Sequence, residues 1–379
     1  MSNKYKIQGT PNSPVLLFSN SLGCTLDMWD ELVPSLLPYF RILQYDTRGH
    51  GGSSGTEDAS GFKIGQLGAD VIQLLDSLGI DKVYFCGLSM GGLIGQWLAI
   101  HYPQRIHKLV LSNTAAKIGT EERWNERIFM VNAEGFDNLA AGTMDRWFTP
   151  GFREAHPALI NQWHRKFLSN HSAGYSSCCA AIRDADFRAQ LHRISAPTLV
   201  ITGSEDEVTT VADAEWMASK MPHARAIMLP CRHLSPVELP EQFIAHLLDF
   251  LIGISVTDRG MHIRRTVLGN AHVDRSLANM TSFNAEFQQL ITQYAWGTIW
   301  SRPGLNKRER SLATLSMLIG LNKPNEFKMH VRAAIHNGLT IEEIKEIILH
   351  SAIYCGVPAA NEAFHLAGEI LKEMEPPDG

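Results

Sequence analysis

The chain has 379 residues, of which 45% are hydrophobic and 19% are charged. This length is enough for two or three domains, and the composition is ordinary for a globular protein with a buried core. The formal net charge of −5 gives no reason to expect nucleic acid or a membrane surface as a partner. The six cysteines show no CxxC spacing, the N-terminus lacks a signal-peptide pattern, and no run approaches the ~20 apolar residues that cross a bilayer. We therefore expect a cytoplasmic protein with reduced thiols.

Short β-favouring runs recur through the first part of the chain, each ending in small or polar residues. They lie at 15–18, 40–46, 82–87, 108–113 and 197–203. Helical patterns separate these runs, for example the leucine-rich segment from Leu67 to Leu78. Alternating strands and helices predict an α/β fold with a mostly parallel sheet that is covered on both faces. In such a sheet the ligand-binding and catalytic residues lie beyond the carboxyl ends of the strands.

One predicted strand end carries the sequence Gly87-Leu88-Ser89-Met90-Gly91, and a helical pattern follows it directly. This is the G-x-S-x-G nucleophile elbow, in which the glycines allow a tight turn and the serine hydroxyl projects above the sheet. A glycine-rich turn with an incidental serine is the alternative, but it would not require the strand–turn–helix context. We predict that Ser89 is a nucleophile.

A nucleophilic serine needs a base, and the base needs an orienting acid, in the order serine, acid, histidine along this fold. The turn after Gly203 offers three acids, Glu205, Asp206 and Glu207. We choose Asp206 because its spacing from Gly203 matches the usual G-x-x-D turn. His233 is chosen from the sixteen histidines because it follows that acid by one strand–turn interval.

An oxyanion hole in this fold uses two main-chain N–H groups. One belongs to the residue after the nucleophile, Met90, and we assign the other to Leu22 in the loop after the first predicted strand. The nearby turn from Asp46 to Gly51 is predicted to be structural, with Asp46 and Arg48 pinning the loop beside the site.

The alternation of predicted strands and helices is interrupted between about residues 114 and 188, where the chain is helical and rich in aromatic residues. We expect a cap over the sheet that forms the roof of the substrate pocket, with most of the aromatics in the core of the cap. Arg123, Arg127 and Arg146 are candidates for binding a substrate carboxylate, although a solvated surface is the simpler expectation for each one alone.

The last part of the chain has a different pattern, with no strand candidate of any length after Gly260. Helical patterns cover 282–300, 307–321 and 325–338, a capping box opens a fourth helix at Thr340, and a fifth begins near Pro358. We predict a first domain over 1–251, a linker at 252–260 and a small all-helical domain over 261–379.

The motifs of the first domain are similar to those of one enzyme family. FSNSLG, MWD, YDTRGHGGSS, FCGLSMGG, GQWLA and RHLSPVE together resemble the 3-oxoadipate enol-lactonase branch of the α/β-hydrolases. The resemblance covers residues 5–251 and implies an α/β-hydrolase with a helical cap. It implies that Ser89, His233 and Asp206 act as a catalytic triad on an enol-lactone.

The helical domain resembles the alkyl hydroperoxidase D-like fold. His330, followed by VRAAIHNG, fits the histidine of the C-x-x-C-x-x-x-H motif of that fold, but Lys323 and Glu326 stand at the two thiol positions. Dithiol peroxide chemistry is therefore not expected. Two longer stretches, NAHVDRSLANMTSFNAEFQQLITQYAWGTIWSRPGL and HSAIYCGVPAANEAFH, resemble 4-carboxymuconolactone decarboxylase over residues 261–371. On that resemblance Cys355 is expected to be a small buried residue.

The second resemblance implies the loss of carbon dioxide from a butenolide whose lactone oxygen takes up the electrons. The substrate is then its own electron sink, so neither a metal nor an organic cofactor is expected. His330 is the predicted proton donor, and His350 and Tyr354, four residues apart, are candidates for the same pocket. The candidates for holding the carboxylates are Arg302, Arg308, Arg310 and Arg332.

Together the two resemblances imply a bifunctional enzyme of protocatechuate breakdown, in the β-ketoadipate pathway. The second domain would convert 4-carboxymuconolactone to 3-oxoadipate enol-lactone, and the first would hydrolyse this product to 3-oxoadipate. The expected partners are small lactone carboxylates and other copies of the chain, joined through the helical domain. The alternative is a Ser-His-Asp esterase of broader specificity with a non-catalytic helical domain for oligomerisation.

Overall fold

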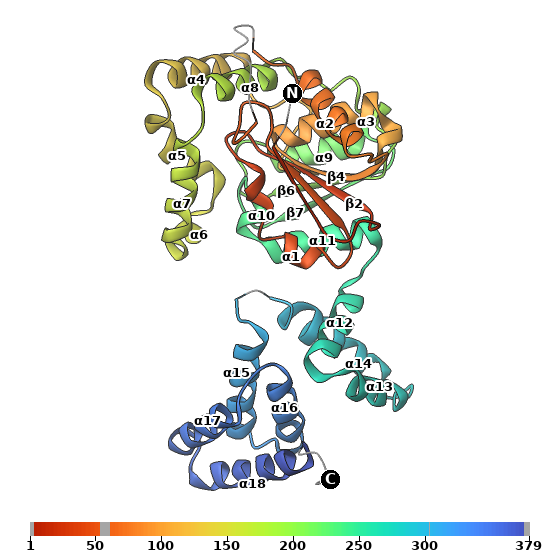
Figure 1. The fold of residues 1–379 in the computed structure, drawn as a ribbon, viewed down its shortest axis with the longest axis vertical. Coiled ribbons are helices and arrows are strands. Elements are labelled where there is room, and N and C mark those ends of the chain that lie inside the picture. Colours follow the sequence, from red (N-terminus) through yellow and green to blue (C-terminus); the bar gives the residue numbers. More distant parts are fainter. Residues whose placement is uncertain (1–3, 54–60, 303, 375–379) are drawn as a thin grey trace. The chain divides into compact units, whose positions relative to one another are not determined.

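The structure is a computed structural model that describes residues 4–53, 61–302 and 304–374. Internal contacts group the chain into two compact units, Met1–Leu251 and Ile252–Gly379 (Figure 1). Within the described ranges, no helix is long and apolar enough to cross a membrane.

The first unit is built on a seven-stranded sheet (Figure 1). β1 pairs with its neighbour antiparallel, and all other neighbours are parallel, so the predicted parallel sheet is confirmed. The strand β1 was not predicted, and β7 was expected before His233 but without a residue range. Both lie at edges of the sheet and are partly exposed, so they lack the continuous apolar run that marks a central strand. In spatial order the strands are β1 (Tyr5–Gln8), β3 (Arg41–Tyr45), β2 (Val15–Ser19), β4 (Val83–Leu88), β5 (Ile106–Ser112), β6 (Thr198–Gly203) and β7 (Ala224–Leu229).

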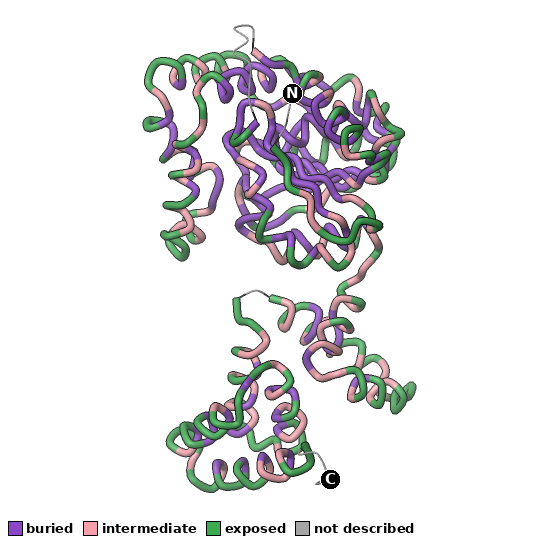
Figure 2. Tube along the Cα trace, viewed as in Figure 1, coloured by how far each residue is buried: buried purple, intermediate pink, exposed green. Residues whose placement is uncertain are grey.

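Helices cover both faces of this sheet, with α2, α3 and α9 on one face and α1 and α11 on the other (Figure 1). The strands between them are the most buried part of the unit (Figure 2). Burying one large apolar side chain contributes about 1.5–3 kcal/mol, and this core holds the strand ends in place. The helices are α1 (Val33–Leu36), α2 (Ile64–Ser77), α3 (Met90–His101), α9 (Val211–Lys220), α10 (Ser235–Glu238) and α11 (Pro240–Ile252).

A group of helices lies between β5 and β6, within the stretch predicted to be a cap. Four aromatic residues of this group, Phe136, Trp147, Phe167 and Tyr175, pack edge to face with ring centroids 5.1–5.9 Å apart. Such a geometry adds to the burial of the rings, so the cap has a core of its own. Its helices are α4 (Glu121–Glu134), α5 (Asp137–Trp147), α6 (Pro150–Ala155), α7 (Pro157–Leu168) and α8 (Ser172–Asp184).

The second unit contains only helices in its described residues, as predicted. Their surfaces are largely exposed (Figure 2). One core lies among α15 to α18 and includes Leu315, Phe327, Val331 and Ile348. The helices are α12 (Val256–Leu268), α13 (Asn270–Ala278), α14 (Ala285–Ile291), the π-helix η4 (Thr292–Ile299), α15 (Lys307–Gly320), α16 (Pro324–His336), α17 (Ile341–Tyr354) and α18 (Val357–Met374).

The linker predicted at 252–260 is largely helical. α11 runs to Ile252, and α12 begins at Val256 after a capping box formed by Ser255 and Asp258. The pattern of α12 was missed because a glycine, Gly260, stands inside it and a charged residue lies on its buried face. That glycine is required, since a Cβ there would lie 2.0 Å from the Thr292 carbonyl oxygen of the π-helix.

Candidate active sites

Ser89 stands in the sharp turn between β4 and α3, with φ 56° and ψ −111°. This left-handed conformation is unfavourable for a non-glycine residue and persists only where the surroundings hold it. Ser89 N donates to the Ser112 carbonyl at 2.9 Å, and Thr114 Oγ1 donates to the Ser89 carbonyl at 2.8 Å. A Cβ at Gly87 would lie 2.2 Å from the Gly91 carbonyl oxygen, so the turn needs its glycine. The fold thus forces the hydroxyl-bearing residue above the sheet.

Asp206 and His233 form a buried pair beyond the ends of β6 and β7. His233 Nδ1 lies 2.8 Å from Asp206 Oδ2, and the same oxygen accepts from Asn113 Nδ2 at 3.0 Å and from Thr209 Oγ1 at 2.8 Å. Burial alone would raise the pKa of the Asp206 carboxyl, but His233 and these donors outweigh it and lower the pKa to about 2. Asp206 is therefore ionised at neutral pH and orients the imidazole.

Ser89, His233 and Leu22 line one cavity of about 60 Å³. The residues of the predicted triad, which are far apart in sequence, thus meet at the carboxyl ends of the strands. Met90 begins α3 directly after the serine. Among the described residues, no hydrogen bond from the main-chain N–H of Leu22 or Met90 is found. Both groups remain available as donors to an oxyanion, and their assignment stays a prediction.

The loop that carries Leu22 is held by the turn predicted to be structural. Asp46 accepts hydrogen bonds from the main-chain N–H groups of Leu26 at 2.7 Å and Gly52 at 2.8 Å. His50 Nε2 accepts from the N–H of Gly23 at 2.9 Å. Burial lowers the pKa of His50 to about 4, so its ring is neutral and can act as this acceptor. The turn therefore fixes the loop from both sides.

Two arginines of the cap, Arg127 and Arg146, line the same cavity as the serine. Both donate from Nη2 to Thr143 Oγ1, at 3.3 and 3.1 Å, and Arg127 Nε donates to the Tyr175 hydroxyl at 2.8 Å. No ion pair to either guanidinium is found in the part of the chain that the structure describes. Burial and the charge of Arg127 lower the pKa of Arg146. Two adjacent cations without a carboxylate partner favour an anionic ligand.

The third arginine candidate of the cap lies farther out. Arg123 is exposed and lines an adjoining cavity of about 360 Å³, to which Arg127 and Arg146 also contribute. It does not line the cavity at Ser89. The structure therefore separates the three arginines that the sequence left equivalent.

In the second unit, His330 lies on α16 with its ring stacked against Trp300, the centroids being 6.3 Å apart. Its Nδ1 atom is buried and has no hydrogen-bond partner among the described residues. Burial, and then the nearby His272, lower the pKa of His330 to about 4. The ring is therefore neutral at pH 7.

The other predicted residues of the second unit lie elsewhere on its helices. His350 and Tyr354 are exposed on α17, with ring centroids 4.9 Å apart, and no contact between this pair and His330 is found among the described residues. Arg332 forms an ion pair with Glu373. Cys355 is exposed rather than buried, so that expectation was wrong: it caps the end of α17, where the chain turns away from the core.

Two other candidates for holding the carboxylates already have partners in the structure. Arg308 forms an ion pair with Glu343, and Arg310 Nη2 donates to the Arg302 carbonyl at 2.9 Å. Neither arrangement singles out a substrate site.

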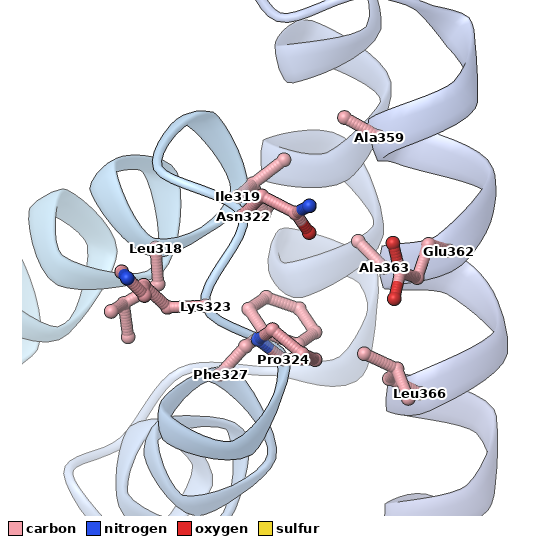
Figure 3. Close-up of a pocket in the computed structure, with 10 residues that line it drawn as sticks. All are labelled: Leu318, Ile319, Asn322, Lys323, Pro324, Phe327, Ala359, Glu362, Ala363 and Leu366. Atoms are coloured by element: carbon pink, nitrogen blue, oxygen red, sulfur yellow. The ribbon is translucent and has the colours of Figure 1, made fainter.

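A small cavity of the second unit lies between α18 and the connection from α15 to α16 (Figure 3). Its lining includes Lys323, Phe327 and Glu362, and none of the predicted decarboxylase residues. Its volume of about 20 Å³ suits a single water molecule and not a lactone.

Sequence reasoning missed the polar residues that hold the predicted ones. Asn113 follows β5, has φ 43°, and donates to both Asp206 and the Arg232 carbonyl. Thr143 lies on α5 and joins the two cap arginines. The position of Asn113 at a strand end was a signal, whereas nothing in the sequence marks Thr143.

Comparisons with known proteins match both units. Residues 14–165 match the family model for the alpha/beta hydrolase fold, and residues 285–369 match the Carboxymuconolactone decarboxylase family. Over 239 residues the chain is 44% identical to 3-oxoadipate enol-lactonase 2 of Acinetobacter baylyi, which covers 63% of this chain and 89% of that relative. Over 116 residues it is 47% identical to 4-carboxymuconolactone decarboxylase of the same bacterium, covering 31% of this chain and 87% of that relative.

A solved structure agrees with the first of these matches. The enol-lactonase from Burkholderia xenovorans LB400 is 40% identical and aligns with a TM-score of 0.64, over 66% of this chain and 96% of that one. The chain therefore belongs to two families, the α/β-hydrolases of the 3-oxoadipate enol-lactonase type and the carboxymuconolactone decarboxylases, fused in one polypeptide.

Proposed function

We propose that this chain is a bifunctional enzyme of protocatechuate breakdown. Its second unit decarboxylates 4-carboxymuconolactone to 3-oxoadipate enol-lactone, and its first unit hydrolyses that lactone to 3-oxoadipate. The observation that carries the proposal is the presence, in one chain, of close relatives of a lactonase and of a decarboxylase. The product of the decarboxylation is the substrate of the hydrolysis, so the fusion joins consecutive steps.

The test is to supply 4-carboxymuconolactone to the full chain and to follow carbon dioxide and 3-oxoadipate together. We expect both products to appear in equal amounts. Release of carbon dioxide with accumulation of the enol-lactone would contradict the lactonase assignment, and no release of carbon dioxide would contradict the decarboxylase assignment.

For the hydrolysis, Ser89 Oγ attacks the lactone carbonyl while His233 takes its proton and Asp206 holds the imidazole in the required tautomer. The main-chain N–H groups of Leu22 and Met90 donate to the oxyanion. The ring oxygen leaves as an enol that becomes a ketone. Water, activated by the same histidine, then attacks the acyl-enzyme and releases 3-oxoadipate. Support comes from the geometry of the Ser89 turn and the 2.8 Å contact between His233 and Asp206.

Arg127 and Arg146 bind the carboxylate of the enol-lactone. They share Thr143 as a hydrogen-bond acceptor, line the cavity at the serine, and have no ion pair among the described residues. A guanidinium binds a carboxylate strongly because both are planar and charged. This pair distinguishes a lactone acid from a neutral ester, which favours the lactonase over an esterase of broad specificity.

Replacing Arg146 by methionine should raise the KM for the enol-lactone about 10- to 100-fold with a smaller change in kcat, since a charged hydrogen bond contributes about 1.5–3 kcal/mol. Methionine keeps the apolar stem of the side chain. Steady-state hydrolysis of the enol-lactone and of a neutral aryl ester would be compared. Arg123→Met is the matched control and should change neither. Equal losses for both substrates would count against carboxylate binding.

For the decarboxylation, the bond between the ring carbon and the leaving carboxylate breaks. Its electron pair moves through the ring double bond to the carbonyl oxygen of the lactone. The resulting enolate takes a proton on carbon, and His330 is the donor. Its ring is neutral at pH 7, because burial and His272 lower its pKa to about 4. The two substrate carboxylates favour the protonated form, so the acid is generated when the substrate is bound.

Replacing His330 by glutamine should lower kcat for release of carbon dioxide about 10²- to 10³-fold, the usual contribution of a general acid. The measurement is carbon dioxide release with the fold checked by circular dichroism. His336→Gln, on the exposed face of the same helix, is the control and should leave kcat unchanged. If the His330 variant keeps near-parental activity, His350 becomes the leading candidate for the proton donor.

We propose further that the helical unit joins copies of the chain in the cytoplasm. Several large apolar side chains of this unit are exposed, among them Phe283 at 98%, Ile353 at 80% and Val357 at 71%. Contiguous exposed apolar surface marks interaction sites, and we propose that these side chains contribute to such a surface. The six cysteines are free thiols, as in a reducing compartment. A monomer in sedimentation experiments at micromolar concentration would contradict the assembly.

A further inference from the structure

A buried arginine of the second unit has no part in the function described so far. Arg264 lies on α12, and only 6% of it is exposed. Its guanidinium donates to Ser276 Oγ at 2.8 Å, Gln288 Oε1 at 3.0 Å and Thr292 Oγ1 at 3.5 Å. All three acceptors are neutral, and Nε is buried without a partner among the described residues. The charge of Arg264 is therefore solvated by dipoles and not balanced by a carboxylate.

Two other arginines of the second unit have carboxylate partners. Arg265, the next residue, forms an ion pair with Asp274 at 2.7 Å, and Arg332 pairs with Glu373. For Arg264 no ion pair is found in the described ranges. A cation without a partner is costly to bury, by several kcal/mol, so stability does not explain its presence. An anion that binds next to it would offset this cost.

A series of contacts connects Arg264 with His330. Val267, three residues after Arg264, packs in one cluster with Trp296 and with Ala333, three residues after His330. The π-helix η4 connects the two sides, because its Thr292 accepts from Arg264 and Trp300, directly after it, stacks on His330. π-Helices occur often at functional sites, since they shift side chains out of helical register.

His272, at the start of α13, interacts electrostatically with Arg264 on one side and with His330 on the other. It is half-buried, and its pKa is lowered by burial and then by Arg264, Arg275 and Arg332. It in turn lowers the pKa of His330, and the acid that acts in the opposite direction there is Glu326. The region between α12, α13, η4 and α16 thus has a surplus of positive charge, and its two imidazoles have pKa values that are lowered first by burial and then by neighbouring groups.

We propose that Arg264, His272 and His330 form one carboxylate-binding site. This inference rests on the proposed decarboxylation and names the residues that recognise its substrate. His272 and His330 contact the anion. Arg264 is a positioning residue, whose positive charge attracts the anion without touching it. The group bound is the carboxylate that the product keeps. A cation held at the departing carboxylate would stabilise the ground state more than the transition state and slow its loss.

The kinetic test uses the full chain with Ser89→Ala, so that only carbon dioxide release from 4-carboxymuconolactone is followed. Arg264→Met should raise KM at least about tenfold with a smaller fall in kcat, and Arg264→Lys should recover part of that loss. The dependence of KM on salt should weaken in Arg264→Met, because a charge is lost. Arg265→Met is the control and should stay within about twofold, since its ion pair with Asp274 is on the surface.

Stability separates a binding role from a structural one. Arg264→Met leaves no carboxylate unpaired, and Ser276 Oγ already lies 3.4 Å from Gln288 Oε1, where the two can pair. The helical content and the midpoint of thermal unfolding should therefore match the parent. A variant that unfolds more easily while its KM stays unchanged would show that Arg264 is structural and would overturn the proposal.

A second readout does not depend on catalysis. Titration with succinate, a small dicarboxylate, should quench a component of tryptophan fluorescence that is lost in Trp300→Phe, because Trp300 stacks on His330. Arg264→Met and His272→Gln should weaken this binding. If carbon dioxide is released but neither KM nor succinate binding depends on Arg264, the proposed site is wrong and the decarboxylase stands. If succinate binding depends on Arg264 but no carbon dioxide is released, the site stands and the decarboxylase falls.

Discussion

Replacing Ser89 by alanine should reduce hydrolysis of 3-oxoadipate enol-lactone by about 10⁴- to 10⁶-fold, the loss that follows removal of a nucleophile from a triad. In the proposed mechanism the Ser89 hydroxyl forms the covalent intermediate, and Ser89 lines the 60 Å³ cavity from the strained turn between β4 and α3. Release of carbon dioxide should continue at the parental rate, because His330 and the helices around it belong to the second unit. The enol-lactone should then accumulate.

The measurement follows carbon dioxide, the enol-lactone and 3-oxoadipate in one reaction. Ser176→Ala is a suitable control, since this serine lies on α8 of the cap, donates to Asn132, and does not line the cavity. Hydrolysis within tenfold of the parent in Ser89→Ala would refute the assignment of the nucleophile. A parallel loss of carbon dioxide release would instead refute the independence of the two sites.

Replacing Asp206 by asparagine should lower kcat of the lactonase by about 10⁴-fold. The amide keeps the shape of the side chain, but its NH₂ group can donate to His233 Nδ1 and so favours the wrong tautomer. The Asp206 carboxylate is ionised at neutral pH. His233, Asn113 and Thr209 lower its pKa to about 2, although burial acts in the opposite direction. Ionisation of this group is therefore not limiting in the neutral range.

The two glutamates beside it are matched controls. Glu205 and Glu207 are exposed, while Asp206 is 5% exposed. Glu205→Gln and Glu207→Gln should leave kcat within about twofold, since surface charges contribute little. A glutamate variant that fell by orders of magnitude would mean that the acid had been assigned to the wrong residue of this turn.

The nucleophile elbow and the acid–histidine pair were predictable from the sequence because they depend on local geometry and chain order. Gly87 is needed by the turn wherever the rest of the chain lies, since a Cβ there would lie 2.2 Å from the Gly91 carbonyl oxygen of the same turn. Gly91 is needed because β2 packs against the elbow, since a Cβ there would lie 2.2 Å from the Ser19 carbonyl oxygen. Asp206 and His233 follow the ends of consecutive parallel strands, and such ends meet at one edge of a sheet. The all-helical character of the second unit could also be predicted, from its apolar periodicity and its capping boxes.

Other features depend on which segments pack together, and no local pattern records that. The edge strands β1 and β7 exist because β3 and β6 offer them free hydrogen-bonding edges, not because their own residues demand a strand. The pairing of Arg127 with Arg146 requires α4 and α5 to meet at Thr143. Likewise, α12 buries Arg264 only because Gly260 lets the π-helix approach closely. The sequence by itself determined the turn at Ser89 and the contact of Asp206 with His233, whose spacing follows from turns and strand order. Tertiary structure alone decided which charges lie together without a partner, because electrostatic balance depends on distances across the fold.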